Sequence, residues 1–238
     1  MSASRVKRLL LPALCVIGLL LFTALGIWQV ERLGWKLDLI ARVDRRIHAQ
    51  PVAVPELGQW LAVDPKWSEY RRVTAAGSFR HDRETLVDAL TERGAGYWVL
   101  TPLVTGSGTI LVNRGFVPSD HADPRTRAAG NSAGPATIVG LLRISEPRGR
   151  VLRPNNPAEN RWYSRDVGAI AQARRLGPVA PFFIDAGAAP NPGGLPIGGL
   201  TVVSFRNAHL VYALTWFALA ALSLGGLVII RKSAQAPA

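Results

Sequence analysis

The sequence predicts an α+β membrane protein, in which two transmembrane helices flank a mostly antiparallel β extracytoplasmic domain with short helices. Two uncharged runs, Leu9 to Val30 and Asn207 to Ile230, lie near the two ends of the chain. A helix rises about 1.5 Å per residue, so each run is long enough to cross a hydrocarbon core of about 30 Å. The third observation is the segment between them, residues 31–207, where short alternating stretches are separated by glycine and proline.

The composition leaves room for one domain outside the membrane and favours partners that carry negative charge. Residues 31–207 have the size of a common single domain. They hold all 16 acidic residues and 23 of the 28 basic residues, a balance of +7. Such a surface suits lipid headgroups, ligand carboxylates or acidic patches on another protein. We expect no nucleic acid partner, because the two spans hold this domain at a membrane.

Cysteine and histidine show none of the usual metal-site patterns. Cys15 is the single cysteine, so neither a disulfide framework nor a cysteine-ligated metal is expected. The four histidines, at positions 48, 81, 121 and 209, lack the spacing of motifs such as H-E-x-x-H. The motifs of serine hydrolases, P-loop proteins and dinucleotide-binding enzymes are also missing. The sequence therefore predicts no catalytic residues.

The first apolar run is interpreted as a retained membrane anchor. It follows a basic tail, residues 1–8, spans the bilayer over 9–30 and continues as a helix to about His48. Ala24-Leu25-Gly26 resembles a signal cleavage site, but the apolar stretch before it is longer than a signal core. The tails 1–8 and 231–238 carry only positive charge, which places both in the cytoplasm. No organellar transit peptide is recognisable, so we expect a bacterial cytoplasmic (inner) membrane with the central domain on the periplasmic side.

Aromatic and basic residues gather where the first span ends. Trp28, Arg32 and Trp35 recur at helical spacing on one face, with Lys36 beside them. The commoner explanation is an interfacial aromatic belt with cations that reach the headgroups. The alternative is that Arg32 or Lys36 binds the anionic group of a ligand.

The central segment is predicted to be mostly strands. The clearest pair, 97–104 and 109–117, flanks a glycine-containing turn and predicts a hairpin. Strands are also expected at 70–79, 136–143, 181–185 and 201–205, a strand or short helix at 84–90, and a helix at 166–176.

Two further features of the central segment concern polar residues. Asn113 and Arg114 are expected to be a structural hydrogen-bond anchor. Six arginines from Arg143 to Arg165 are expected on a solvated face, which is able to meet anionic lipid or an acidic partner.

The second span, residues 208–230, begins with a histidine. On a helix, His209 shares a face with Trp216 and two alanines, and Tyr212 lies three residues away. Ionisable groups at this depth are costly and often functional, and imidazole is a common ligand of haem iron. The residues alone fit equally an interfacial histidine bonded to backbone or water. The alanines beside Trp216 leave space for a flat ligand or for a neighbouring helix.

Five different short motifs follow one another along the chain. They are Gly26-Ile27-Trp28-Gln29 with Arg32 and Trp35-Lys36; Tyr70-Arg71 with Gly77-Ser78-Phe79; Gly96-Tyr97-Trp98-Val99 with Thr101-Pro102-Leu103; Leu111-Val112-Asn113-Arg114-Gly115-Phe116-Val117-Pro118; and Asn207 with His209-Leu210, Tyr212-Ala213 and Thr215-Trp216. Together they resemble the surfeit-locus-one family of cytochrome c oxidase assembly factors. Phe116, where the family usually has tryptophan, and Ala208, where asparagine is common, depart from the pattern.

The resemblance implies a membrane-anchored carrier, not an enzyme, that binds haem a transiently and hands it to subunit I of the oxidase. His209 corresponds to the proposed ligand of the haem iron. Tryptophans would wall the ring and cations would pair the propionates, so the further cofactor-binding residues expected are Trp216, Tyr212, Trp28, Arg32, Lys36 and Arg206. Haem a synthase and other oxidase assembly factors are candidate further partners.

Two other functions stay open at this stage. A cofactor-free scaffold would stabilise an oxidase assembly intermediate, and its contact surface would be the segment from Arg143 to Arg165. A membrane-tethered enzyme ranks third, because it requires a pocket in the central domain with a perturbed pair of titratable groups.

Overall fold

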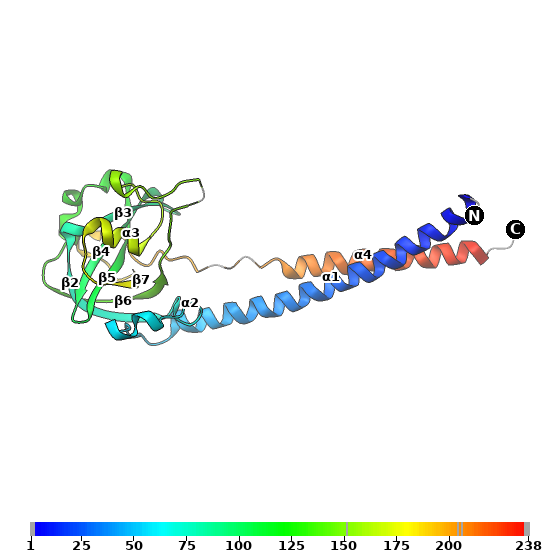
Figure 1. The fold of residues 1–238 in the computed structure, drawn as a ribbon, viewed down its shortest axis with the longest axis horizontal. Helices are drawn as coiled ribbons and strands as arrows, with labels where there is room; N and C mark the ends of the chain where they lie inside the picture. The colour runs from blue at the N-terminus through cyan, green and yellow to red at the C-terminus, as the bar shows by residue number, and fades with distance from the viewer. Residues whose placement is uncertain (1–2, 151, 204, 206, 236–238) are drawn as a thin grey trace. The chain divides into compact units, whose positions relative to one another are not determined.

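The computed structural model describes residues 3–150, 152–203, 205 and 207–235 and divides into two compact units (Figure 1). The helix unit consists of the chain up to Arg42 together with the chain from Ser204 onward, and the β unit is Val43–Val203. The prediction of an α+β protein with two long apolar helices and a β-rich domain is confirmed.

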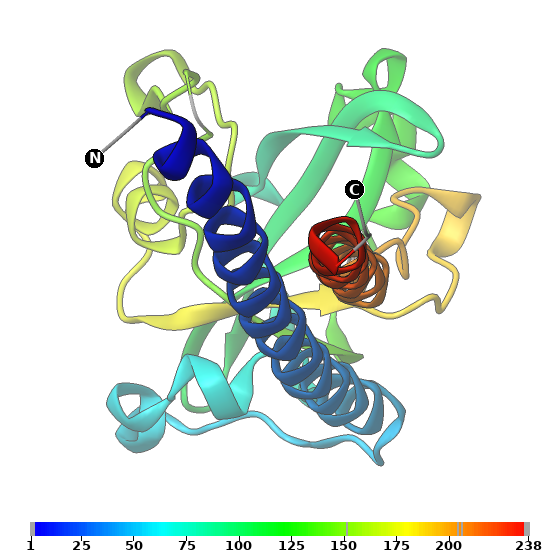
Figure 2. The ribbon, with the colours of Figure 1, turned by 90° about the vertical axis from the view of Figure 1, so that its right-hand side faces the viewer.

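The helix unit contains α4, His209–Gln235, and α1, Ala3–His48, except for the residues of α1 from Val43 onward, which belong to the β unit. Both helices are long and apolar enough to cross a membrane, with mean hydropathies of 2.5 and 2.2 over their most apolar stretches. Little of that apolar surface is buried within the protein, which fits a lipid environment. Figure 1 shows the first turns of α1 and the last turns of α4 at the same end, and Figure 2 shows the two helices crossing at an angle.

The β unit is built on a seven-stranded sheet. In chain order the strands are β1 (Val52–Ala53), β2 (Arg72–Phe79), β3 (Thr85–Thr91), β4 (Gly94–Thr105), β5 (Gly108–Pro118), β6 (Pro135–Ile144) and β7 (Val179–Ala186). Their spatial order is β1-β2-β6-β7-β5-β4-β3, and β2 also pairs with β4. This additional pairing closes five strands, β2, β6, β7, β5 and β4, into a small barrel. Most pairs are antiparallel, as predicted, whereas β1 with β2 and β5 with β7 are parallel.

Short helices connect the strands and help to form the core. They are η1 (Leu57–Ala62), α2 (Pro65–Ser68), η2 (His81–Arg83), η3 (Ser119–His121), η4 (Pro124–Gly130), η5 (Pro157–Glu159), α3 (Val167–Arg174) and η6 (Pro192–Gly194). The buried apolar side chains form two clusters, one around Phe182 and Leu103 and one around Phe183 and Ile170 of α3. Since successive side chains of a strand point to opposite faces, adjacent phenylalanines of β7 serve both clusters.

The structure confirms several predicted elements of the β unit. The hairpin predicted around residues 105–108 is the β4–β5 ladder, in which Thr105 pairs with Gly108. The segment 84–90, predicted as a strand or a short helix, is a strand: β3 covers Thr85–Thr91. The helix predicted over 166–176 is α3, and the Asp166 carboxylate caps it by accepting from the Ala169 N–H at 3.1 Å.

The strand predicted over residues 201–205 is wrong. Residues 201–203 and Phe205 form no strand, and Val202 is 72% exposed, whereas Ser204 lies outside the described residues. The Thr201 hydroxyl instead donates a hydrogen bond to Asp185 Oδ2 at 3.0 Å. A side-chain bond to a distant residue therefore holds this segment, and apolar alternation in the sequence does not reveal such a bond.

Closure of the barrel depends on a glycine in β2. Ser78 and Phe79 pair with Val104 and Leu103 of β4. A Cβ at Gly77 would collide with the carbonyl oxygen of Val104. A backbone atom cannot move aside as a flexible side chain can, so only glycine lets β2 approach β4 at this point.

Gly77→Ala is expected to lower the free energy of unfolding by about 1–3 kcal/mol, because it overpacks a backbone contact. Urea unfolding of the full chain in detergent, followed by near-UV circular dichroism, measures the change. Gly106→Ala is the control, since a Cβ at Gly106 meets nothing within 4 Å, and we expect it to change stability by no more than about 0.5 kcal/mol. Equal effects of the two substitutions would contradict this account of closure.

Arg114 ties loops to the barrel, as the structural interpretation of Asn113 and Arg114 predicts. It is 4% exposed, and its guanidinium donates to Asn131 Oδ1 at 2.9 Å and to the Gly130 carbonyl. It also donates to Nδ1 of His81 at 3.3 Å. Burial lowers the pKa of Arg114 to about 10, so the group stays charged at neutral pH. The charge is stabilised by neutral oxygen and nitrogen acceptors and by the Phe79 ring at 5.2 Å.

His81 makes the stability of this network depend on pH. Partial burial, together with the charge of Arg114, lowers its pKa. The unfolded chain, where histidine has a pKa of about 6.5, then binds the proton more readily than the folded chain. Stability is therefore complete above about pH 6.5 and falls as the pH drops through the lower folded pKa. In unfolding curves measured between pH 7.5 and 4.5, His81→Gln should lose this part of the pH dependence. An unchanged profile would exclude His81 as its source.

Candidate functional site

Aromatic and small side chains bring α1 and α4 together along a contact that we call the seam. Gly26 has no side chain, and the Phe217 ring lies where its Cβ would be. One turn earlier on α1, the rings of Phe22 and Trp216 stack with centroids 5.7 Å apart and planes 19° from parallel. Residues four apart lie on one helical face, so a single stripe of α1 faces α4.

One polar pair lies in the seam at the start of α4. Gln29 is only 8% exposed, and its Oε1 lies 2.8 Å from Nδ1 of His209, which is half-buried. An amide oxygen can only accept a hydrogen bond, so the contact is satisfied when Nδ1 carries the proton. In neutral imidazole the lone pair is then on Nε2. The sequence pattern could have indicated Gln29, because it follows Phe22 and Gly26 at helical spacing.

The space beside Trp216 is occupied by α1. Ala213 and Ala220, which flank this tryptophan on its face of α4, are 2% and 6% exposed. At the two alanines the structure shows a neighbouring helix and no space for a flat ligand, whereas Trp216 itself is half-buried.

Three of the predicted cofactor-binding residues lie at the seam or beside it. His209 bonds Gln29 and Trp216 stacks on α1, as described above. The Lys36 ammonium lies 5.1 Å from the centroid of the Phe205 ring, a residue that precedes α4. The structure thus brings an imidazole, an indole and a cation to the same side of α1.

The other predicted residues are not brought into the seam. Trp28 is 53% exposed and Tyr212 is 55% exposed. Arg32 is also exposed, and its guanidinium lies 4.1 Å from the ring centroid of Trp35. That contact matches the interfacial-belt explanation of these residues. Arg206 lies outside the described residues, and its role stays a prediction.

The donor set of the seam suits a haem better than a bare metal ion. A haem would need only one nitrogen ligand from the protein, which His209 could supply, because the porphyrin provides the other nitrogens. Across the ranges that the structure describes, no three His, Cys, Asp or Glu side chains come together as metal ligands.

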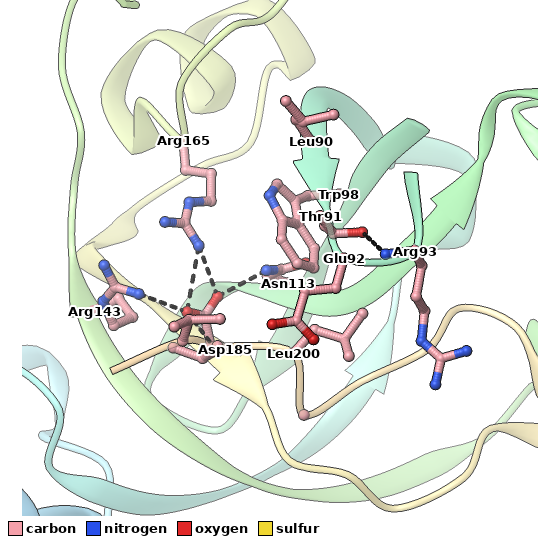
Figure 3. Close-up of a pocket in the computed structure, with 13 residues that line it drawn as sticks. Leu90, Thr91, Glu92, Arg93, Trp98, Asn113, Arg143, Arg165, Asp185 and Leu200 are labelled. Carbon is pink, nitrogen blue, oxygen red and sulfur yellow. Dashed lines mark hydrogen bonds and ion pairs between the residues drawn. The ribbon is translucent and has the colours of Figure 1, made fainter. Parts of the chain in front are cut away.

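A second candidate site is a cavity of about 480 Å³ in the β unit (Figure 3). Leu90, Trp98 and Leu200 contribute apolar side chains to its wall. Thr91, Glu92, Arg93 and Thr201 contribute polar side chains, and so do four further residues: Asn113, Arg143, Arg165 and Asp185. Figure 3 shows these four side chains converging, with the carboxylate bonded to both guanidinium groups.

Asp185 has its hydrogen-bonding capacity filled by the protein. It is 2% exposed, and its Oδ1 accepts from Asn113 Nδ2 at 2.8 Å and from Arg165 Nη1 at 3.1 Å. Its Oδ2 accepts from Arg143 Nη1 at 2.9 Å and from the Thr201 hydroxyl at 3.0 Å. Two carboxylate oxygens offer about four acceptor directions, so little capacity is left for a ligand.

The prediction that the arginines from 143 to 165 share a solvated face is wrong for two of them. The side chains of Arg143 and Arg165 are 13% and 14% exposed, because Asp185 pairs them from a strand far along the chain. The others remain at the surface: Arg148, Arg150, Arg153 and Arg161.

Two charged groups of the ion-pair cluster at this cavity, Glu146 and Arg165, are held in their ionised forms. Burial by itself would raise the pKa of Glu146, but hydrogen bonds and the charge of Arg165 outweigh it and lower the pKa. Burial would lower the pKa of Arg165, but Asp185 and Glu146 outweigh it and raise the pKa. A general acid or base works best with a pKa near the operating pH, which neither shift favours. The cluster is therefore better described as a structural ion-pair network than as an active site.

Asp185→Asn should lower the free energy of unfolding by about 3–5 kcal/mol, since it leaves two buried guanidinium groups without their shared charge. Urea unfolding of the full chain in detergent measures the loss. Glu159→Gln is the control, because Glu159 pairs with Arg161 at 3.3 Å on the surface, where a pair contributes at most about 1 kcal/mol. A loss at Asp185 no larger than that of the control would show that the network does not stabilise the fold.

Comparison with known proteins places the chain in a family. The SURF1 family matches residues 16–221. Surfeit locus protein 1 of Homo sapiens is 40% identical over 218 residues, covering 83% of this chain and 69% of that protein. Surfeit locus protein 1 of Rattus norvegicus is 40% identical over 217 residues, covering 83% and 68%. The SURF1-like protein of Monosiga brevicollis is 38% identical over 222 residues, covering 87% and 82%. The chain therefore belongs to the SURF1 family.

Proposed function

We propose that the protein is an assembly factor for haem-copper cytochrome c oxidase, which binds haem a and assists its delivery to subunit I. Membership of the SURF1 family supports the role in oxidase assembly. The two long apolar helices support a place in the membrane. We place the protein in a bacterial cytoplasmic membrane, where the basic tails favour an orientation with the β unit on the periplasmic side.

The observation that carries the haem-binding part of the proposal is the state of His209. Its Nδ1 is held by Gln29 at 2.8 Å, so Nε2 is the nitrogen that remains for a metal. The ring is half-buried at the start of an apolar helix, where an ionisable side chain is costly to keep. His209 would hold the iron, Trp216 would contact the ring, and Lys36 would pair a propionate as a charge-assisted contact.

A single protein ligand suits a carrier. Haem a is the cargo, and the oxidase uses its redox chemistry only after transfer. The protein must bind haem strongly enough to limit free haem and weakly enough to release it. One imidazole, with no second ligand assigned to this chain, meets that requirement.

A cofactor-free scaffold is a second candidate function, and an exposed segment of the β unit favours it. Leu152 is 95% exposed, and Arg148, Arg153 and Arg161 lie exposed on the same stretch of chain. An exposed apolar side chain among cations suits an acidic protein partner. The scaffold would stabilise an oxidase intermediate through this segment without binding haem.

His209→Ala should lower the haem a content of the purified protein at least about tenfold. The reason is that even the outer hydrogen bonds of a metal site typically contribute 10–100-fold in affinity. The measurement is a pyridine haemochrome spectrum after co-expression with haem a synthesis. His48→Ala is the matched control, since His48 is exposed and bonds the Asp44 carbonyl oxygen at 2.9 Å.

The same preparations separate the two candidate functions. Equal haem content in wild type and His209→Ala would remove His209 from the ligand role. Haem-free wild-type protein that still co-purifies with subunit I would instead support the scaffold.

A further inference from the structure

We propose that Gln29 is the positioning residue for His209: its amide oxygen fixes the imidazole as the Nδ1–H tautomer and so presents Nε2 to the haem iron. The inference rests on the proposed function for its ligand, and on the seam for its geometry. It assigns to α1 a role in a site whose metal ligand lies on α4.

The hydrogen bond itself fixes the proton. Gln29 Oε1 and His209 Nδ1 are 2.8 Å apart, which is a good hydrogen-bond distance. The amide oxygen has no proton to give, so Nδ1 must donate. A neutral imidazole has one N–H, and therefore its lone pair is on Nε2.

The seam buries the Gln29 side of this bond and keeps the bond in place. Gln29 is 8% exposed, and three residues before it Gly26 allows the Phe217 ring to pack against the α1 backbone. An amide buried among apolar groups without a partner costs about 1–3 kcal/mol, so His209 is a partner that Gln29 cannot readily give up. The ring orientation of His209 is thereby coupled to the packing of two helices.

An amide acceptor suits a carrier that must release its cargo. Histidines that bind metals usually donate their second N–H to a carboxylate, a carbonyl or a water, and this raises the basicity of the ligand. A carboxylate partner strengthens the ligand further than a neutral amide does. Glutamine thus gives orientation with moderate donor strength, and a glutamate in its place should bind the iron more tightly.

The first test reads the tautomer directly and needs no haem. The full chain, labelled with ¹⁵N-histidine and held in detergent, is compared with Gln29→Leu, Gln29→Glu and Glu31→Gln; His209→Ala identifies the signal. We expect Nδ1 of His209 to be protonated in wild type, in Gln29→Glu and in the exposed control Glu31→Gln. In Gln29→Leu the population should shift toward the Nε2–H form. An unprotonated Nδ1 in wild type, or no shift in Gln29→Leu, overturns the proposal.

The second test reads the ligand through haem a binding and the midpoint potential of the bound haem. Gln29→Leu should weaken haem a binding by about 10–100-fold, and Gln29→Glu should restore binding and shift the potential to more negative values. The glutamate variant keeps the proposal testable if the leucine variant folds poorly. Unchanged affinity and potential in both variants would overturn the positioning role.

The two tests distinguish failure of this inference from failure of the proposed function. If the tautomer shifts as expected but no variant, including wild type, binds haem, the proposed function fails, and the role of Gln29 in positioning a haem ligand fails with it. If wild type binds haem through His209 but neither the tautomer nor the potential responds to Gln29, only the inference fails.

Discussion

The hydrogen bond between Gln29 and His209 lies where neither group can easily be left without a partner. Away from water, a buried amide without a hydrogen bond costs about 1–3 kcal/mol, so the two side chains must meet wherever the helices pack. They meet because Gly26 lets Phe217 approach the backbone of α1 and because Phe22 stacks on Trp216. The apolar packing of the helices brings the two polar side chains together, and the hydrogen bond between them orients the imidazole.

The β unit also buries polar groups, and it provides partners for them in two ways. Asp185 is buried with two arginines, Arg143 and Arg165, so that opposite charges satisfy one another. Arg114 is buried without a carboxylate in hydrogen-bond contact among the described residues. Carbonyl and amide oxygens of the surrounding loops accept hydrogen bonds from its guanidinium. The first arrangement joins β6, β7 and the segment before α3, and the second holds loops against the end of β5. In both arrangements the charged groups already have partners within the protein. A cavity beside such groups is therefore not, by itself, evidence of an active site.

The sequence predicted the elements that have a local signature. Two uncharged runs, the glycine turn of the β4–β5 hairpin and the Asp166 cap are each readable within a few residues. The segment 201–203 and the arginines 143 and 165 were misread because their partner, Asp185, lies 16 to 42 residues away. The face of α1 that meets α4 is marked only by the helical spacing of Phe22, Gly26 and Gln29, a weak signal in a span that is apolar all round. Trp28, Arg32 and Trp35 do share a face, but Gln29 lies on the one that is buried.

The seam also shows how one polar pair can determine the register of two packed helices. Helices that touch through glycine and alanine can shift along each other, because one small residue offers much the same groove as the next. A shift by one turn, about 5.4 Å, would pull the amide oxygen away from the imidazole. The hydrogen bond between Gln29 and His209 thus fixes the register of the two helices, because it forms only when these two turns lie opposite each other.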